Sequence, residues 1–425
     1  MTVKFLKTMT LSSMLLGSLM TASTTTNAYP IDGYLETGIS RLEYYRLSEA
    51  GEIDGKTLFE GAKRTTDEIQ PRLIGIDGHS ELPKADSSVS AQLAPLIPDQ
   101  PGRYGIALLD LTDPDAPVYA EHNSDYLSNV GSVGKVLVAV ALFAKLHEIY
   151  PDDVEKRREI LRDTIVTADE FVIKDHHKIR FWDVENRTLE YRALQVGDQG
   201  NLYEYLDWAL SPSSNAAAAM LQRELVLMDH FRKDYPVSDQ VAQSYLEDTP
   251  KTELSKSFLN AMVSPLQMAG IDTDKLRQGS FFTRTGKNRI PGTNSYGNPR
   301  QLIKLLYLME TGKLIDAFSS TELKRLIYLT ERRIRYASHP NLNAHSMYFK
   351  TGSLYGCQPE EGFKCGKYQG NRLNILASIA IVESEEDGKK YHYLAVVQSN
   401  VLKVNSAVAH QTLASRIHKL VKSLH

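Results

Sequence analysis

Hydrophobic runs near both ends of the main part of the chain predict strands. Residues 105–111 and 118–120 are apolar and are separated by the turn-forming residues 113–115. Residues 373–382 and 391–398 are rich in Ile, Val, Leu and Ala and have the length of strands. We therefore expect the two ends to share one antiparallel sheet, which places the chain in the α+β class.

The segments between these strands have mostly helical patterns. A run from Ser132 to about Ile149 is apolar nearly all round, so it predicts a buried helix. Residues 406–424 are amphipathic and predict a closing helix. The expected architecture is an antiparallel sheet flanked by helices, with an all-helical subdomain. Residues 29–87 are polar and turn-rich, and we interpret them as an N-terminal extension before a main domain of residues 88–425.

Composition narrows the classes of function. The 425 residues are 42% hydrophobic, which is enough for a sizeable core. The net charge is −3, and acidic and basic residues are interspersed. Such a chain has no electrostatic footprint for nucleic acid or for an anionic membrane surface. Small-molecule or peptide chemistry is the better hypothesis.

The first 28 residues have the pattern of a signal peptide. Lys4 and Lys7 precede an apolar stretch of residues 9–20, and Thr26-Asn27-Ala28 is a small-residue cleavage site. The apolar stretch is shorter than the ~20 residues that a bilayer-spanning helix needs. A retained membrane anchor is the alternative interpretation. We expect cleavage after Ala28 and an exported protein, periplasmic or secreted, with no membrane span after cleavage.

Cysteines and histidines give two further expectations. Cys357 and Cys365 are the chain's two cysteines and lie in a turn-rich stretch. In an exported protein they favour a disulfide over two free thiols. His176 and His177 are adjacent and lack the spacing of a zinc-binding HExxH motif, which favours surface or structural histidines. We expect no metal and no cofactor.

Candidate chemistry lies in three short motifs. In the first, Ser132 and Lys135 are three positions apart on a helix, which places them on one face, one turn from each other. A serine hydroxyl is a poor nucleophile and needs such a nearby base. A serine helix cap with a lysine extending to solvent is the structural alternative. The motifs are Ser132-Val133-Gly134-Lys135, Ser213-Ser214-Asn215 and Lys350-Thr351-Gly352.

The second and third motifs have structural alternatives of their own. The Ser213 motif precedes a helical run and is typical of a helix cap. Lys350 lies in a predicted strand of residues 347–354, where solvent-facing polar residues would mark an edge. Gly352 would allow close approach of the backbone. Three purely structural motifs would rarely occur together in this order, so we favour a functional interpretation of the set.

The three motifs in this order resemble the S-x-x-K, S-x-N and K-T-G signature of penicillin-binding proteins and serine β-lactamases. The resemblance covers Ser88 to His425 and is closest to the class A β-lactamase catalytic domain. It implies a β-lactamase/transpeptidase-like fold and a β-lactam or a D-alanyl peptide as substrate. The roles that it implies are nucleophile for Ser132, base for Lys135, proton relay for Ser213, binding of the substrate amide for Asn215, positive charge for Lys350, contact with the substrate carboxylate for Thr351, and an oxyanion hole of the Ser132 and Ser353 N–H groups beside Gly352.

The sequence departs from this resemblance in one respect. Class A β-lactamases have a glutamate in an E-x-x-L-N motif that activates the water for release of the acyl group. The corresponding residues here, 279–286, contain no carboxylate. The spacing between Ser132 and Ser213 is also longer than usual, which indicates an insertion around residues 163–198. We therefore expect the acyl-enzyme to accumulate, unless Lys135 or an acidic residue from the insertion acts as the base.

Two functional hypotheses follow. The first is an enzyme that forms an acyl-enzyme at Ser132 with a β-lactam or with a D-alanyl peptide of the cell wall. The second is a non-hydrolytic β-lactam or peptidoglycan binding or sensing protein on the same fold. Turnover distinguishes the two.

Overall fold

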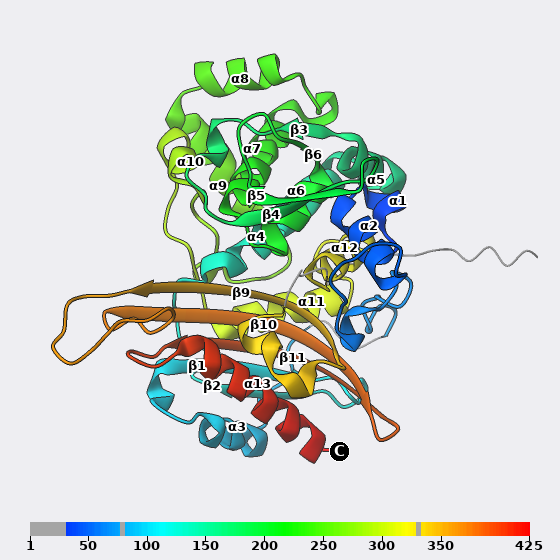
Figure 1. Cartoon of the computed structure of the whole chain (residues 1–425). Coiled ribbons are helices and arrows are strands. Elements are labelled where there is room, and N and C mark those ends of the chain that lie inside the picture. The colour runs from blue at the N-terminus through cyan, green and yellow to red at the C-terminus, as the bar shows by residue number, and fades with distance from the viewer. Residues whose placement is uncertain (1–30, 77–80, 329–332) are drawn as a thin grey trace, which may run out of the picture.

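The computed structural model describes residues 31–76, 81–328 and 333–425. Figure 1 shows one antiparallel sheet with helices on both faces, and a mainly helical part beyond one of these faces. The predicted α+β class is therefore confirmed. The predicted signal peptide, residues 1–28, lies outside the described residues.

Both ends of the main domain contribute strands to the sheet. These strands are β1 (Tyr104–Asp110), β2 (Val118–His122), β9 (Ser346–Gly356), β10 (Leu373–Glu386) and β11 (Lys389–Asn400). They lie in the order β2-β1-β11-β10-β9, and every neighbouring pair is antiparallel. The K-T-G motif is on β9, at one edge of the sheet, where Thr351 pairs with Ser378 of β10.

Both faces of the sheet are buried. Successive side chains of a strand point to opposite sides, so neighbouring residues pack in different cores. Phe349 packs in the core that includes α13 (Ser406–Ser423). Tyr348 packs in the larger core that includes α4 (Gly134–Ile149). Lys350 has the same parity as Tyr348, so its side chain is on the face of the sheet that is turned toward the helical part.

The helical part is built around α4, which is buried on nearly all sides, as its apolar sequence predicts. The other α-helices of this part are α5 (Val154–Asp163), α6 (Leu202–Leu210), α7 (Asn215–Phe231), α8 (Asp239–Asp248), α9 (Lys251–Met268), α10 (Arg284–Arg289), α11 (Pro299–Glu310) and α12 (Ala317–Tyr328). Helices α7, α9 and α12 pack against α4. The Ser132 motif at the start of α4 is therefore held by a rigid frame.

Short antiparallel sheets accompany these helices. They pair β3 (Ile165–Thr167) with β6 (Gln199–Asn201), β4 (Lys178–Asp183) with β5 (Thr188–Ala193), and β7 (Leu276–Arg277) with β8 (Tyr296–Gly297). The β4–β5 hairpin lies within the insertion that the sequence indicates between Ser132 and Ser213. The insertion is therefore folded, and β4 begins directly after His177.

The N-terminal extension packs against the helical part (Figure 1). Arg41 forms a buried ion pair with Asp207 of α6, with 2.6 Å between Nε and Oδ2. The ring of Tyr44 packs edge-on against Trp182 of β4, with 5.3 Å between the ring centroids. The extension thus contacts both α6 and β4. The helices in and next to this segment are α1 (Tyr34–Thr37), α2 (Ser40–Glu49) and α3 (Ser87–Leu93).

Candidate active site

Ser132 lies in a 3-10 turn, Gly131–Val133, that leads directly into α4. The N–H groups at this end of a helix have no helical carbonyl partner, so the positive end of the helix dipole is next to the hydroxyl. Gly131 has a φ of 53°, which glycine adopts at little cost. A Cβ atom at Gly131 would lie 3.2 Å from the amide nitrogen of Ser353. Glycine at this position therefore lets the turn lie against β9.

Lys135 lies one turn after Ser132 and is only 1% exposed. Its Nζ is 3.0 Å from Ser132 Oγ, 2.7 Å from the Ser213 carbonyl oxygen and 2.7 Å from Asn215 Oδ1. Burial removes the water that would stabilise the ammonium ion, and it lowers the pKa of Lys135 to about 7. A neutral amine can donate its two N–H bonds to the two carbonyl oxygens and accept the Ser132 proton on its lone pair. This geometry suits a base for Ser132.

The Ser213 motif forms the turn before α7, as the sequence predicts. Ser213 has a φ of 69°, and its Oγ is 3.3 Å from Lys135 Nζ. Ser214 is the N-cap of α7, since its Oγ accepts a 3.1 Å hydrogen bond from Ala217 N–H. The motif therefore has two sides: Ser213 and Asn215 contact Lys135, whereas Ser214 secures the helix.

Lys350 is 3% exposed on β9. Its Nζ donates a 2.6 Å hydrogen bond to the carbonyl oxygen of Leu210, the last residue of α6. Burial, together with the nearby charges of Lys135 and Arg335, holds the pKa of Lys350 well below its usual value. Lys350 therefore joins the sheet to the helical part at the cavity.

Close contact between backbones places β9 beside Ser132. A Cβ atom on Gly352 would overlap the amide nitrogen of Ser132 and the carbonyl oxygen of Val130. Glycine at this position therefore allows the strand to approach the Ser132 turn. The Ser353 amide follows immediately, so the two N–H groups expected to form an oxyanion hole belong to segments that lie against each other.

Arg335, which the sequence analysis did not identify, contacts the same strand. It donates hydrogen bonds of 2.7 Å to Thr351 Oγ1, 3.0 Å to Ser353 Oγ and 3.1 Å to the Tyr368 hydroxyl. Arg335 itself has a φ of 52° and is the first residue of a 3-10 helix, Arg335–Ser338. No motif includes it, because its contacts depend on the folded position of β9 rather than on local spacing. Arg335 fixes two hydroxyl groups of the candidate substrate-binding strand.

A cavity of about 1010 Å³ contains Ser132, Ser213, Asn215, Thr351 and Ser353 in its lining. The stretch 279–286 contributes Ser280, Phe281 and Phe282, but no aspartate or glutamate from the described ranges lines the cavity. The lining is therefore strongly cationic, although the whole chain has a net charge of −3. Its lysines and arginines are Lys178, Lys287, Arg333, Arg335, Lys350 and Lys367.

The loop that joins β9 to β10 is closed by a disulfide between Cys357 and Cys365, with 6.1 Å between the Cα atoms. The predicted disulfide is thus confirmed. Residues on both sides of the disulfide loop, Tyr355 and Tyr368, line the cavity. The disulfide therefore restricts one rim of the cavity.

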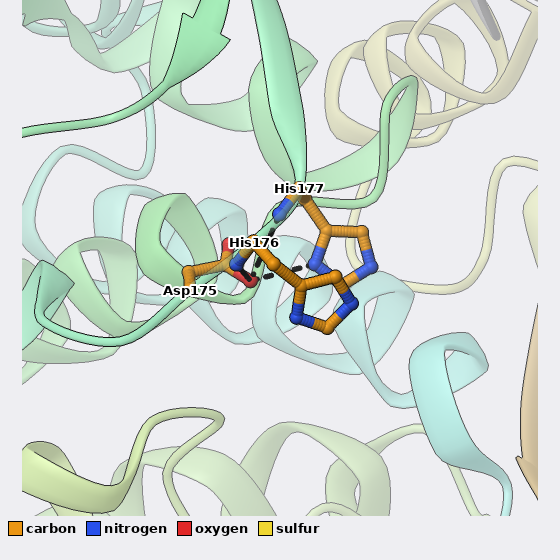
Figure 2. A group of neighbouring side chains, drawn as sticks. All are labelled: Asp175, His176 and His177. Carbon is orange, nitrogen blue, oxygen red and sulfur yellow. Dashed lines mark hydrogen bonds and ion pairs between the residues drawn. The ribbon is translucent and has the colours of Figure 1, made fainter.

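His176 and His177 also line the cavity, although the sequence favoured surface or structural roles for them. Asp175 Oδ1 is 2.6 Å from His177 Nδ1, and the two imidazole rings stack with centroids 4.6 Å apart. Figure 2 shows the two rings side by side, with the carboxylate next to His177. The only local sign of this pairing is the Asp-x-His spacing, because the cavity forms from segments that are far apart in the sequence.

A comparison with protein families agrees with the motifs. A profile of the β-lactamase enzyme family matches residues 88–420. Among solved structures, a β-lactamase from Chitinophaga pinensis is 17% identical, with 80% of this chain and 98% of that chain covered and a TM-score of 0.48. The penicillin-binding protein PBP-A is 13% identical, with 80% and 100% covered and a TM-score of 0.48.

A reconstructed class A β-lactamase, the last common ancestor of those of Gram-negative bacteria, is 18% identical, with 80% and 100% covered and a TM-score of 0.49. No curated protein matches the chain. The family profile spans most of the 425 residues, including all three motifs. The chain therefore belongs to the β-lactamase enzyme family.

Proposed function

We propose that this protein is an exported serine hydrolase that forms an acyl-enzyme at Ser132 with β-lactams or D-alanyl cell-wall peptides. One observation carries the proposal. Lys135 Nζ lies 3.0 Å from Ser132 Oγ, and burial lowers the pKa of this amine to about 7. A serine with a buried, partly neutral amine beside it has the base that nucleophilic attack needs.

The remaining groups fit the steps of acyl transfer. Lys135 takes the proton of Ser132, and Oγ attacks the amide carbonyl carbon of the substrate. The N–H groups of Ser132 and Ser353 stabilise the oxyanion, and each such donor contributes about 10²–10³-fold to the rate. Ser213 passes a proton from Lys135 to the leaving nitrogen as the C–N bond breaks. The product of this half-reaction is an ester on Ser132.

The charge of the cavity supports an anionic substrate. Both proposed substrates carry a carboxylate, and a low-dielectric cavity lined by one sign of charge attracts the opposite sign. Thr351 and Ser353 of β9, whose hydroxyl groups accept hydrogen bonds from Arg335, line this cavity. We assign these hydroxyls, Gly352 and Lys350 to carboxylate recognition, and Asn215 to the substrate amide.

Export to the periplasm or the medium remains a proposal based on residues 1–28. In the part of the chain that the structure describes, no helix has the length and apolarity needed to cross a membrane. The Cys357–Cys365 disulfide supports export, since disulfides persist in oxidising compartments.

A non-hydrolytic binding or sensing protein is the second candidate. It is favoured by the stretch 279–286, which contains no carboxylate to activate water. Without such a base the second half-reaction loses about 10²–10⁴-fold in rate. The ester on Ser132 would then persist.

Intact-protein mass, followed over time after addition of penicillin, tests both candidates. The proposed enzyme gains the mass of one penicillin and then returns to its own mass, whereas a sensing protein keeps the adduct. Ser132→Ala should gain no mass at all. An adduct that forms equally on Ser132→Ala would place the nucleophile elsewhere and refute the proposal.

A further inference from the structure

The pair of Asp175 and His177 has no place in the acylation chemistry described above, although His177 lines the same cavity as Ser132. The side chain of Asp175 is 1% exposed, and that of His177 is 27% exposed. A buried carboxylate that contacts a partly exposed imidazole resembles the way in which many hydrolases orient a histidine base. The remaining question is which atoms of the pair are available.

The carboxylate of Asp175 is fully occupied by donors from the protein. Oδ1 accepts from the backbone N–H groups of His176 and His177, at 2.9 and 3.3 Å, as well as from the His177 ring. Oδ2 accepts from Ser214 Oγ at 2.9 Å and from Ala216 N–H at 3.0 Å. Burial opposes ionisation, but these donors hold the pKa of Asp175 below its usual value. A metal ion would have to displace them, so we interpret the cluster as an orienting one.

The ring of His177 is thereby held in one tautomer. A carboxylate can only accept, so Nδ1 carries the proton and donates it to Asp175 Oδ1. Nε2 is then the basic nitrogen, and within the described ranges it has no hydrogen-bond partner. Desolvation lowers the pKa of His177, and the attraction of Asp175 only partly opposes this effect. The ring is therefore neutral near pH 7 and able to accept a proton.

A continuous series of contacts fixes the pair relative to the nucleophile. Asp175 holds Ser214 and the first turn of α7. The neighbouring Ser213 and Asn215 accept hydrogen bonds from Lys135, which contacts Ser132. The pair and the nucleophile are thus attached to opposite sides of one short turn. The cavity that His177 and Ser132 both line is large enough to hold water beside a substrate.

We propose that His177, positioned by Asp175, is the general base that activates water to release the acyl group from Ser132. This inference rests on the proposed function. Water gives one proton to His177 Nε2, and its oxygen bonds to the ester carbon. The bond between that carbon and Ser132 Oγ then breaks, and Oγ regains a proton from Lys135, which is resupplied from His177 through cavity water. The products are a free carboxylic acid and the original serine.

The test measures release separately from acylation. The protein is first loaded with penicillin, excess drug is removed, and the decay of the adduct is followed by intact mass. His177→Ala and the similarly sized His177→Gln should acylate normally but release about 10²–10⁴-fold more slowly. His230→Ala, at an exposed position near the far end of α7, is the matched control and should release at the native rate. Adding free imidazole should accelerate release from His177→Ala.

The pH profile separates a base from a structural residue. Release by the native protein should be constant above neutral pH and slow down as the pH falls through the pKa of His177, and this dependence should disappear in His177→Gln. Asp175→Asn should weaken the dependence because it leaves the ring unoriented. The charged groups that act on His177 are Asp175, His176 and Lys135, and the cavity adds the six lysines and arginines named above.

The outcomes are distinguishable. If both His177 variants are acylated and release the acyl group at the rate of the native protein, a role for His177 is refuted, whereas the proposed function stands. Absence of any adduct on the native protein would refute both. Slow release without imidazole rescue and with an unchanged pH profile would make His177 a structural residue.

Discussion

Acylation of Ser132 should depend strongly on pH through the protonation of Lys135. Only the neutral amine can accept the serine proton, and the ammonium ion cannot. Because burial lowers the pKa of Lys135 to about 7, the rate of acylation should rise as the pH rises through this value. The perturbation is therefore a pH series on the native protein, combined with two substitutions that move the pKa in opposite directions.

The magnitude follows from the neutral fraction of the amine. With a pKa of about 7, that fraction is roughly one-eleventh at pH 6 and roughly ten-elevenths at pH 8, so the rate should rise about tenfold between them. The charge of Asp175 raises the pKa of Lys135, and that of Arg335 lowers it. Asp175→Asn should therefore shift the midpoint to lower pH, and Arg335→Gln should shift it to higher pH.

Stopped-flow fluorescence with a labelled penicillin gives the second-order rate constant of acylation at each pH. Asp54→Asn, an exposed substitution in the extension, controls for a change of net charge and should leave the midpoint unchanged. An acylation rate that is constant from about pH 5 to about pH 9 would refute the role of Lys135 as the base. Midpoints that move in the same direction in Asp175→Asn and Arg335→Gln would show that the electrostatic surroundings of Lys135 are misassigned.

Three further predictions concern groups around the site. Lys350→Ala should slow acylation by about 10²-fold, and an unchanged rate would show that its charge is not used. Arg41→Ala breaks a buried ion pair and should lower the free energy of unfolding by about 3–5 kcal/mol in urea titrations, whereas Arg46→Ala, in a more exposed pair, should cost under about 1 kcal/mol. Equal effects of the two arginine variants would contradict this. The double variant Cys357→Ser, Cys365→Ser should have a free energy of unfolding about 2–3 kcal/mol lower than that of the native protein, again in urea titrations. A double variant as stable as the native protein would contradict this prediction.

The sheet could be predicted from local pattern, but its extent could not. The apolar runs 373–382 and 391–398 correspond to β10 and β11, which continue further into a polar hairpin. There the cross-strand pairs match Glu385 with Lys390 and Glu386 with Lys389. Opposite charges facing each other stabilise strands without apolar alternation. A pattern of hydrophobicity alone therefore ends these strands too early.

For the site too, part could be predicted from the sequence and part could not. Ser132 and Lys135 could be paired from the sequence because a helix fixes their separation. The family resemblance implied roles for Ser213 and Asn215 at the same site, but not that both contact Lys135, as they do in the structure. Arg335 and the insertion behave differently, since their contacts reach the cavity only through tertiary packing. The sequence showed that a carboxylate was missing from 279–286, but not that the insertion brings a histidine to the same cavity.

The N-terminal extension contacts two elements that contribute to the lining of this cavity, α6 and β4. Arg41 pairs with Asp207 of α6, and the end of α6 receives the hydrogen bond from Lys350. Tyr44 packs against Trp182 of β4, the strand that begins directly after His177. Other extension residues, Ile39 and Leu42 among them, belong to the main hydrophobic core.

These contacts bear on how the chain divides into domains. An independent domain keeps its own core, and few contacts cross its boundary. Here, removing residues 29–87 would leave Asp207 as a buried charge without its arginine, which costs several kcal/mol. It would also expose apolar core beside the helix that receives Lys350. We therefore propose that the extension and residues 88–425 fold as one unit, in which the extension supports α6, whose end accepts the hydrogen bond of Lys350, and β4, which begins directly after His177.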